Sequence, residues 1–351
     1  MRLFSRPQPP HGPATPPPPP VTFDPAAGDP QGHQMMRWVA AGDWRSAHQF
    51  LEGVTGWDDR SYFLRLISRW DPFPEEWISA TGGSQLAFLA RGMQRVQAAW
   101  RARGSGKGET VTEQGWKEFF AVLNLAEDDL ARAAELVPED PVPWTSRITV
   151  ARGLEMSKEE VLRRLGEVNA RAPGFRPAYV TAVVSVAQKW RGSHALMFDV
   201  AREANRTLPA GNPGRVAIAW AHALRFQYYL GWEKARDTAL GYYKDPAVGA
   251  EILGAAEACV LSPGFPETLD SPWPRADFAL SLALAGDGDI AYRHRSAALF
   301  PPLGDSPPVD TLWRERYGGK EGEQFARIRQ LSFRAAAAGP TQPAPASPSQ
   351  G

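Results

Sequence analysis

Apolar residues recur at helical spacing along most of the chain, and strand-like alternation of apolar and polar residues is nearly absent. Helical spacing of apolar residues is present, for example, in residues 161–172 and 196–208. Such a pattern marks one apolar face on each of a series of amphipathic helices, so it predicts an all-α fold. The clearest stretch places apolar side chains at Trp116, Phe119, Phe120, Leu123, Leu130, Ala134 and Val137.

Start and stop signals accompany these helical stretches. Thr110 with Glu113, and Ser157 with Glu160, match the spacing of a capping box, in which side chains at both ends satisfy free backbone N–H groups. Glycines follow several predicted helices, where a left-handed residue ends a helix at little cost. These glycines are Gly42, Gly153, Gly192, Gly231 and Gly286.

The helix ends repeat with a regular period. Three stretches each read as a helix end, a proline, two or three residues and a second proline: "LARAAELVPEDP" (130–141), "LGEVNARAPGFRP" (165–177) and "AREANRTLPAGNP" (201–213). Their first prolines, Pro138, Pro173 and Pro209, are 35 and 36 residues apart. Each unit also breaks in its middle, at 151–160, 189–196 and 229–235. Two helices in about 35 residues predict a helix–turn–helix repeat.

This period and the proline at the end of the second helix resemble the tetratricopeptide repeat. The resemblance covers 113–245 and is weaker at 31–55 and 278–300. The family's Trp–Leu–Gly–Tyr signature is not reproduced, because the first helices begin "PVPWTSRITVARG" and "PAYVTAVVSVAQKW". The strings "DPVPW", "ARG" and "KWRGS" also resemble a bacterial helical family of unassigned function. The resemblance implies an α-solenoid, a right-handed stack of hairpins, elongated because each hairpin buries its apolar face against its neighbours.

The ends of the chain differ from this body in composition. Residues 1–30 hold eleven prolines, and 339–351 lack charged and large apolar side chains, so both are expected to be disordered tails. The proline run is either a spacer or a ligand for an aromatic groove. The helical-repeat domain is then 31–338, with 31–103 and 113–300 as its two blocks.

Charge and composition narrow the range of partners and compartments. Lys+Arg and Asp+Glu both number 39, which argues against a dedicated nucleic-acid or anionic-membrane surface. No apolar run approaches the ~18 residues of a membrane span, and no secretory signal follows the first residues. The single cysteine, Cys259, allows no internal disulfide and is expected to be a buried structural thiol. We therefore expect a cytoplasmic protein, and the usage rich in Ala, Arg, Gly, Pro and Trp indicates a bacterial source.

No sequence motif supports catalysis or a cofactor. The stretch "RGSGKGET" (103–110) departs from a phosphate-binding P-loop, which needs Gly, four residues and then Gly-Lys-Ser/Thr, and it is interpreted as a flexible loop. Six scattered histidines without a cysteine pair predict no metal site. A set of Ser193, His194 and Asp199 is disfavoured as a catalytic triad, because Ser193 suits a helix N-cap.

Surface side chains of the first helices therefore become the candidates for function. These candidates include Arg152. Aromatic and basic side chains suit an acidic peptide or a carboxylate, although Tyr179 and Trp220 could equally be core residues and the arginines merely solvated. The predicted partner-binding residues are Arg147, Tyr179, Lys189, Trp190, Arg191, His194, Trp220, His222 and Arg225.

The sequence thus predicts a non-catalytic interaction module that binds a protein or peptide segment on a helical groove, with no cofactor. The alternatives are an enzyme or small-ligand binder with a site in a helical cleft, and a structural spacer. An open groove favours the first hypothesis, and a pocket with converging titratable groups favours the second. Tryptophans near helix ends fit packing at turns or a ligand platform; they are Trp44, Trp70, Trp100, Trp144, Trp190 and Trp232.

Overall fold

The computed structural model describes residues 18–104 and 106–338, and over these ranges it is helical with no strand, which confirms the all-α prediction. A single isolated bridge joins Asp24 to Pro308. The α-helices are α1 (Pro30–Ala41), α2 (Trp44–Glu52), α3 (Trp57–Ile67), α4 (Glu76–Ala80), α5 (Gln85–Arg103), α6 (Glu113–Leu136), α7 (Pro141–Gly153), α8 (Lys158–Arg171), α9 (Arg176–Ser185), α10 (His194–Thr207), α11 (Ala217–Gly231), α12 (Arg236–Tyr242), α13 (Pro246–Glu257), α14 (Pro272–Ala285), α15 (Ile290–Ala297), α16 (Leu312–Tyr317) and α17 (Glu321–Ala338). Short 3-10 turns are η1 (Gly108–Thr110), η2 (Gln188–Trp190), η3 (Pro213–Val216) and η4 (Pro301–Leu303). None of the helices in these ranges is long and apolar enough to cross a membrane.

The predicted hairpins are present where the prolines place them. Pro141 opens α7 behind Asp140, whose side chain accepts a hydrogen bond from the Val142 backbone N–H. Pro213 opens η3, which leads into α11. Proline suits the first turn of a helix because the N–H it lacks would have no partner inside the helix. The pairs α7–α8, α9–α10 and α11–α12 therefore follow the 35- to 36-residue period.

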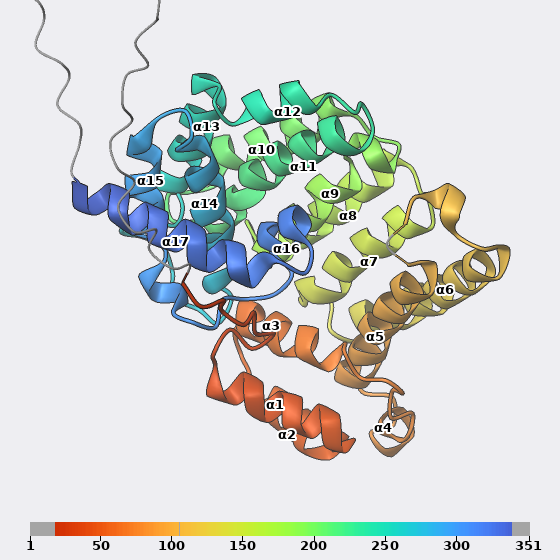
Figure 1. Ribbon diagram of the computed structural model, residues 1–351. Helices are drawn as coiled ribbons and strands as arrows, with labels where there is room; N and C mark the ends of the chain where they lie inside the picture. Colours follow the sequence, from red (N-terminus) through yellow and green to blue (C-terminus); the bar gives the residue numbers. More distant parts are fainter. Residues whose placement is uncertain (1–17, 105, 339–351) are drawn as a thin grey trace, which may run out of the picture.

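The hairpins stack in two layers (Figure 1). The first helices pack side by side in the order α5, α7, α9, α11 and α14, and α6, α8 and α10 cover them from outside. The inner helices are apolar on most sides, since residues 217–224 of α11 are all buried. Outer helices keep a single buried stripe, as in α8, where Val161, Leu165 and Val168 face inward. This difference follows from burial on two sides against burial on one.

The stack does not stay open, because its N-terminal helices contact its C-terminal half (Figure 1). Arg65 of α3 donates a hydrogen bond of 2.9 Å to Asp270, just before α14. The Tyr62 and Trp273 rings meet edge to face at 5.9 Å, and Arg69 pairs with Asp310 at 2.9 Å. The predicted elongated shape with nearest-neighbour contacts alone is therefore wrong at this point: pairs more than 200 residues apart hold the two halves together.

The N-terminal segment differs from the predicted tail over the residues that the structure describes. The backbone N–H of Val21 donates to Gly322, and that of Asp24 donates to Pro307 at 2.9 Å. The Phe23 ring packs edge to face on Phe325 of α17. One aromatic side chain among the prolines thus supplies enough apolar surface to dock residues 21–29 on the body. The rest of the two predicted tails, 1–17 and 339–351, lies outside the described residues.

Some predicted helix starts and ends differ from the structure. Ser157 caps α8 as predicted, but Thr112 rather than Thr110 caps α6, accepting from the Gly115 N–H at 3.1 Å. Thr110 instead closes η1 by donating its hydroxyl to the Lys107 carbonyl. Among the five predicted stop glycines, only Gly42 adopts the left-handed conformation, with φ 69°.

Cys259 is fully buried, as the sequence predicts. Burial raises the pKa of its thiol to about 12. A thiol with such a pKa stays protonated at neutral pH, so Cys259 is a packing residue and not a nucleophile.

Candidate functional site

The turns inside successive hairpins converge on one cleft. Its walls come from the ends of α5, α7, η2 and α11 and from the connections that follow them. The cleft has two half-open lobes of about 590 and 560 Å³. Both lobes share Trp100, Arg103, Gly108, Lys189 and Trp190, so they form one continuous hollow.

A recurring sequence feature builds these walls. Each contributing element ends in a basic or aromatic residue next to a glycine, as in Arg103-Gly104, Arg152-Gly153 and Gly231-Trp232. Cations are favoured at helix C-termini because the last carbonyls carry partial negative charge. The glycine allows close packing: a Cβ on Gly153 would lie 2.4 Å from a methyl carbon of Leu123. The period of the repeat therefore brings like residues to one place.

Guanidinium groups are stacked on indole rings in the wall that the lobes share. Arg152 lies over Trp100 at 4.7 Å and over Trp190 at 5.2 Å. Arg103 lies 5.7 Å from the Trp100 ring and 5.4 Å from the Trp190 ring. The two indoles meet edge to face at 5.3 Å. Each stacked pair is favourable by about 0.5–2 kcal/mol, so the tryptophans fix where the positive charges lie.

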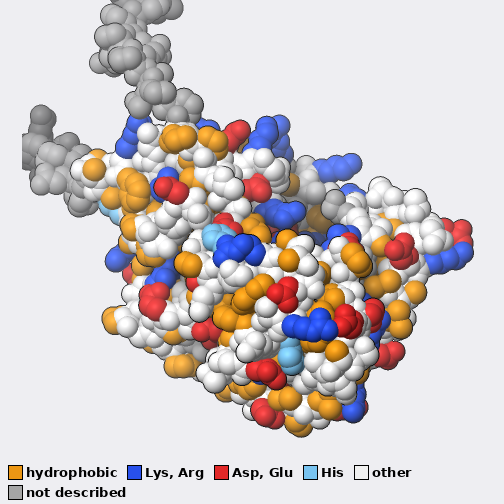
Figure 2. Space-filling model, turned by 90° about the horizontal axis from the view of Figure 1, so that it is seen from below, with side chains coloured by type: hydrophobic (Ala, Val, Ile, Leu, Met, Phe, Trp, Pro, Cys, Tyr) orange, Lys and Arg blue, Asp and Glu red, His pale blue; other side chains and the backbone are white. Residues whose placement is uncertain are grey.

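Most of the cations of the cleft have no carboxylate partner. Among the described residues, no Asp or Glu oxygen lies within ion-pair distance of five of the six cations that line the cleft. Most arginines elsewhere in the fold are paired with a carboxylate. On the face shown in Figure 2, basic and acidic side chains are likewise interspersed. Arg191 is the exception in the cleft, because it pairs with Glu155. The cations without a carboxylate partner are Arg103, Lys107, Arg152, Lys158 and Lys189, of which Arg103, Lys107 and Lys158 donate hydrogen bonds to backbone carbonyls instead.

Burial makes these charges costly. It lowers the pKa of Arg152 to about 10, and the nearby charge of Arg103 acts in the same direction. Burial also lowers the pKa of Lys189, against the opposing influence of Glu315 of α16. The pKa values of Arg103 and Lys158 are lowered by burial too. An anion in the cleft would oppose all four shifts, because an opposite charge favours the protonated form of each group.

Three buried donors at the same place lack an acceptor within the described ranges. They are the indole N–H groups of Trp100 and Trp190 and the Nε–H of Arg152. Unsatisfied buried polar groups are uncommon in folded proteins, and each calls for an explanation. All three are donors, so they add to the positive potential of the cleft and leave it short of acceptors.

Three of the nine predicted partner-binding residues line the cleft, and two others interact with each other outside it. Lys189, Trp190 and Arg191 line the cleft. His194 and Arg225 lie outside the lining and interact with each other at 2.6 Å, with Arg225 also paired to Glu233. These five keep access to solvent.

Three others are core residues and not surface residues. Tyr179 is buried in α9. Trp220 donates its indole N–H to buried Asp277 at 2.7 Å. His222 lies between the Tyr242 hydroxyl, at 2.8 Å, and Glu251, at 3.1 Å. Their helices are covered on both sides, so even polar side chains at these positions find their partners inside the protein.

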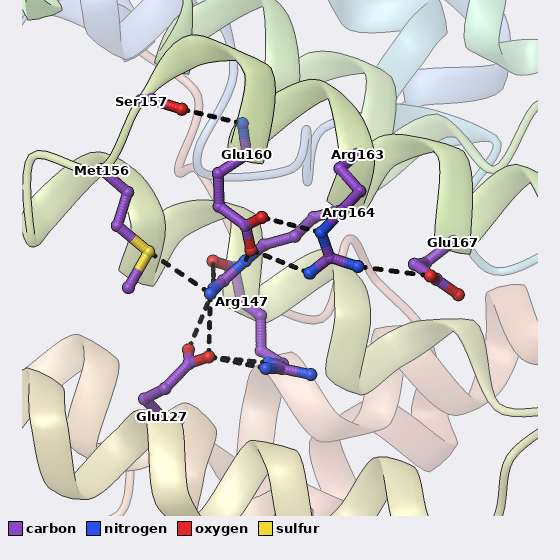
Figure 3. A network of polar contacts seen from close by, with 8 residues as sticks. All are labelled: Glu127, Arg147, Met156, Ser157, Glu160, Arg163, Arg164 and Glu167. Carbon is purple, nitrogen blue, oxygen red and sulfur yellow. Dashed lines mark hydrogen bonds and ion pairs between the residues drawn. The ribbon is translucent and has the colours of Figure 1, made fainter.

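Arg147 belongs to an internal ion network (Figure 3). It contacts Glu127 of α6 at 2.7 Å, and Arg164 of α8, only 3% exposed, contacts the same carboxylate at 2.9 Å. Arg164 also pairs with Glu160 at 2.7 Å. Charged partners on three helices thus fix α6, α7 and α8 relative to one another, and Arg147 is occupied in that role.

Several lining residues were missed from the sequence. Trp100 and Trp232 were interpreted mainly as packing at turns, and Lys107 was assigned to a flexible loop. Arg103 belongs to the same predicted loop, although it is the last residue of α5, and no pattern in the sequence singles out Lys158. The sequence does hold one signal for these residues: a basic or aromatic residue stands beside a glycine at each break inside a repeat. This pattern indicates a binding site only when the breaks are known to lie close together in space.

Within 18–104 and 106–338, no three His, Cys, Asp or Glu side chains gather as a metal site would require. Comparisons of the chain with models of known families, with curated proteins and with solved structures give no match. The cleft is therefore interpreted from its own chemistry.

Proposed function

We propose that this protein is a non-catalytic binding module, built as a tetratricopeptide-like array, whose cleft takes an anionic group carried by a segment of a partner protein. The single observation that carries this proposal is the convergence of five cations without carboxylate partners, among the described residues, on one hollow. The net charge of the whole chain is zero, so this concentration of positive charge is local.

The energetics favour an anion as the occupant. A partly desolvated cation without a partner is costly, and an opposite charge that enters the cleft offsets this cost. Such an interaction has greater strength where water is partly excluded than on an open surface. The half-open walls leave a path for a side chain presented from solvent. An acidic partner segment satisfies both conditions.

The lining favours binding over catalysis. The walls contain no histidine or cysteine among the described residues, and the hydroxyl of Ser157 already accepts the hydrogen bond that caps α8. Histidine is the commonest general acid–base group and cysteine a strong nucleophile, whereas the titratable groups of this lining are mainly cations, with Glu109, Glu155 and Glu159 as the carboxylates. A second candidate, binding of a small free anion, is favoured by the volume of about 590 Å³, which suits a small molecule as well as a side chain.

The test uses the tryptophans of the cleft as reporters. Fluorescence is recorded while the full chain is titrated with random peptide pools rich in Asp and Glu, with neutral pools and with small dicarboxylates. The acidic pool is expected to change the emission, with an apparent affinity that falls as salt screens the charges. Equal signals from acidic and neutral pools would contradict the proposal, and a response to dicarboxylates alone would favour the second candidate.

Matched variants locate the binding. Lys107→Gln with Lys189→Gln removes two cleft charges and is expected to weaken binding of the acidic pool at least about tenfold. Arg206→Gln removes an exposed charge on α10, away from the cleft, and should leave binding unchanged. Wild-type affinity in the double variant would assign the binding to another surface.

A further inference from the structure

We propose that the anionic group taken by the cleft is a phosphate monoester, carried on a phosphorylated side chain of the partner segment. This inference rests on the proposed function, since it names the chemistry of the anion that the same cleft binds.

The density of charge is the first argument. Six cationic and three acidic side chains line the two lobes, and neither lobe exceeds about 590 Å³. One carboxylate carries a single negative charge and would leave most of this excess unbalanced. A phosphate monoester carries about −1.5 to −2 at neutral pH on three strong acceptor oxygens. It therefore matches a compact cluster of cations better than one carboxylate does, and several carboxylates would need a longer groove.

The identity and orientation of the donors is the second argument. Arg103 and Arg152 lie over the same two indole rings. One terminal nitrogen of Arg103 donates to the Gly104 and Gly106 carbonyls, whereas the buried Nε–H of Arg152 has no acceptor among the described residues and can donate to a bound oxygen. Lys189, which lines both lobes, adds a mobile ammonium group. Planar forks combined with ammonium groups are the donor set that proteins use for phosphate oxygens.

The occupied aromatic faces indicate what carries the phosphate. Trp100 and Trp190 are covered by guanidinium groups. Trp232 stacks on Tyr228 at 5.4 Å with an angle of 1°, and Lys107 lies 5.6 Å from its ring. The two tryptophans that line both lobes thus have little ring surface left to stack on a nucleobase, and the surface that stays open, on Trp232 with 44% exposure, lies in the second lobe alone. The geometry favours a phosphate on a flexible aliphatic or phenolic side chain over a nucleotide.

The experiment compares three matched peptide pools with random flanks and a central phosphoserine, glutamate or serine. Binding of each fluorescent pool to the full chain is measured by anisotropy, with inorganic phosphate as a competitor. The phosphoserine pool is expected to bind at least about tenfold more tightly than the glutamate pool. Its affinity should fall as the pH drops below about 6, where the phosphate loses its second charge.

The outcomes separate this inference from the proposed function. Equal binding of phosphoserine and glutamate pools, both above serine, would overturn the phosphate assignment and leave the anion-binding function in place. Equal binding of all three pools would overturn both. Competition by inorganic phosphate at concentrations similar to those of the phosphopeptide would support the phosphate chemistry and overturn the partner segment as its source.

Variants add a check that does not depend on overall affinity. Arg152→Gln and Lys189→Gln, made separately, are expected to reduce the preference for phosphoserine over glutamate to less than about threefold, because each removes a charge-assisted donor. Arg206→Gln should keep the full preference. Circular dichroism confirms folding of each variant, and Lys189→Gln remains informative if Arg152→Gln unfolds. An unchanged preference in a folded Lys189→Gln variant would overturn the assignment of the phosphate to this cleft.

Discussion

Replacing Asp270 by asparagine removes the one negative charge that two guanidinium groups share at the junction of the two halves. Arg176 of α9 donates two hydrogen bonds to this carboxylate, one of them at 2.6 Å, and Arg65 of α3 donates another at 2.9 Å. Asp270 and Arg176 are nearly inaccessible to solvent. The substitution keeps the shape of the side chain and removes the carboxylate that both cations contact directly, so that only more distant carboxylates such as Asp58 and Asp310 offset their charge.

Breaking a buried ion pair by removing one partner costs about 3–5 kcal/mol, because a desolvated charge remains. The amide oxygen of asparagine keeps one acceptor, so we expect a loss at the lower end, about 3 kcal/mol of the free energy of unfolding at pH 7. Urea titration followed by circular dichroism measures this loss. The control is Glu203→Gln, which removes an exposed partner of Arg206 and should leave the free energy of unfolding unchanged within error.

A pH series gives an independent check. Burial alone would raise the pKa of Asp270, but the charges of Arg176 and Arg65 more than reverse this effect and hold the pKa below its ordinary value. The carboxylate therefore stabilises the fold above the unfolded-state pKa of about 4, and this contribution disappears as the pH falls through the lower folded-state pKa. The difference between wild type and Asp270→Asn should shrink in acid. A loss below about 1 kcal/mol at pH 7, or one that grows in acid, would refute the reasoning.

Four further substitutions test other parts of the fold by urea titration. Leu165→Ala should cost about 2–5 kcal/mol because Leu165 is buried in α8, whereas Arg163→Ala on the exposed face should cost less than about 1 kcal/mol; equal losses would refute the orientation of the helix. Tyr62→Phe should cost about 1 kcal/mol by removing the hydrogen bond to the Ala26 carbonyl, and an unchanged stability would mean that residues 21–29 do not dock there. Burial and the charge of the neighbouring Asp270 raise the pKa of Asp58 to about 6. The ionised carboxylate therefore destabilises the fold, and this loss of stability develops as the pH rises from about 4 to 6. Asp58→Asn should stabilise the protein by about 1–2 kcal/mol at pH 7 and have no such effect near pH 4.

The sequence predicts those parts of the structure that depend on neighbouring residues. Pro141 and Pro213 begin elements as expected, and Ser157 caps α8, because each effect acts within one turn of helix. The period of about 35 residues also survives in the stacked hairpins. Local steric and hydrogen-bonding preferences are legible in one sequence.

Contacts between distant segments were not predictable in the same way. Nothing in the residues around Arg65 indicates that it meets Asp270, since the pair depends on how the whole array curves. The sequence leaves open whether Trp220 is a binding residue or a core residue, because its partner, Asp277, lies 57 residues further along the chain. The cleft also depends on contacts between distant segments. The sequence predicts Lys189 and Trp190 as binding residues, but Arg103 lies beside them only because four hairpin turns stack.

The contact between Arg65 and Asp270 also has a consequence during synthesis. The two residues are 205 positions apart, so at about 5–20 residues per second the arginine is synthesised about 10–40 s before its partner. During that interval helices α5 to α11 can stack one after another, because their contacts lie within neighbouring repeats. The N-terminal helices must wait for the segment before α14. The junction is therefore a late event in the life of the nascent chain, and a ribosome stalled before residue 270 would carry an array that is stacked but not yet closed.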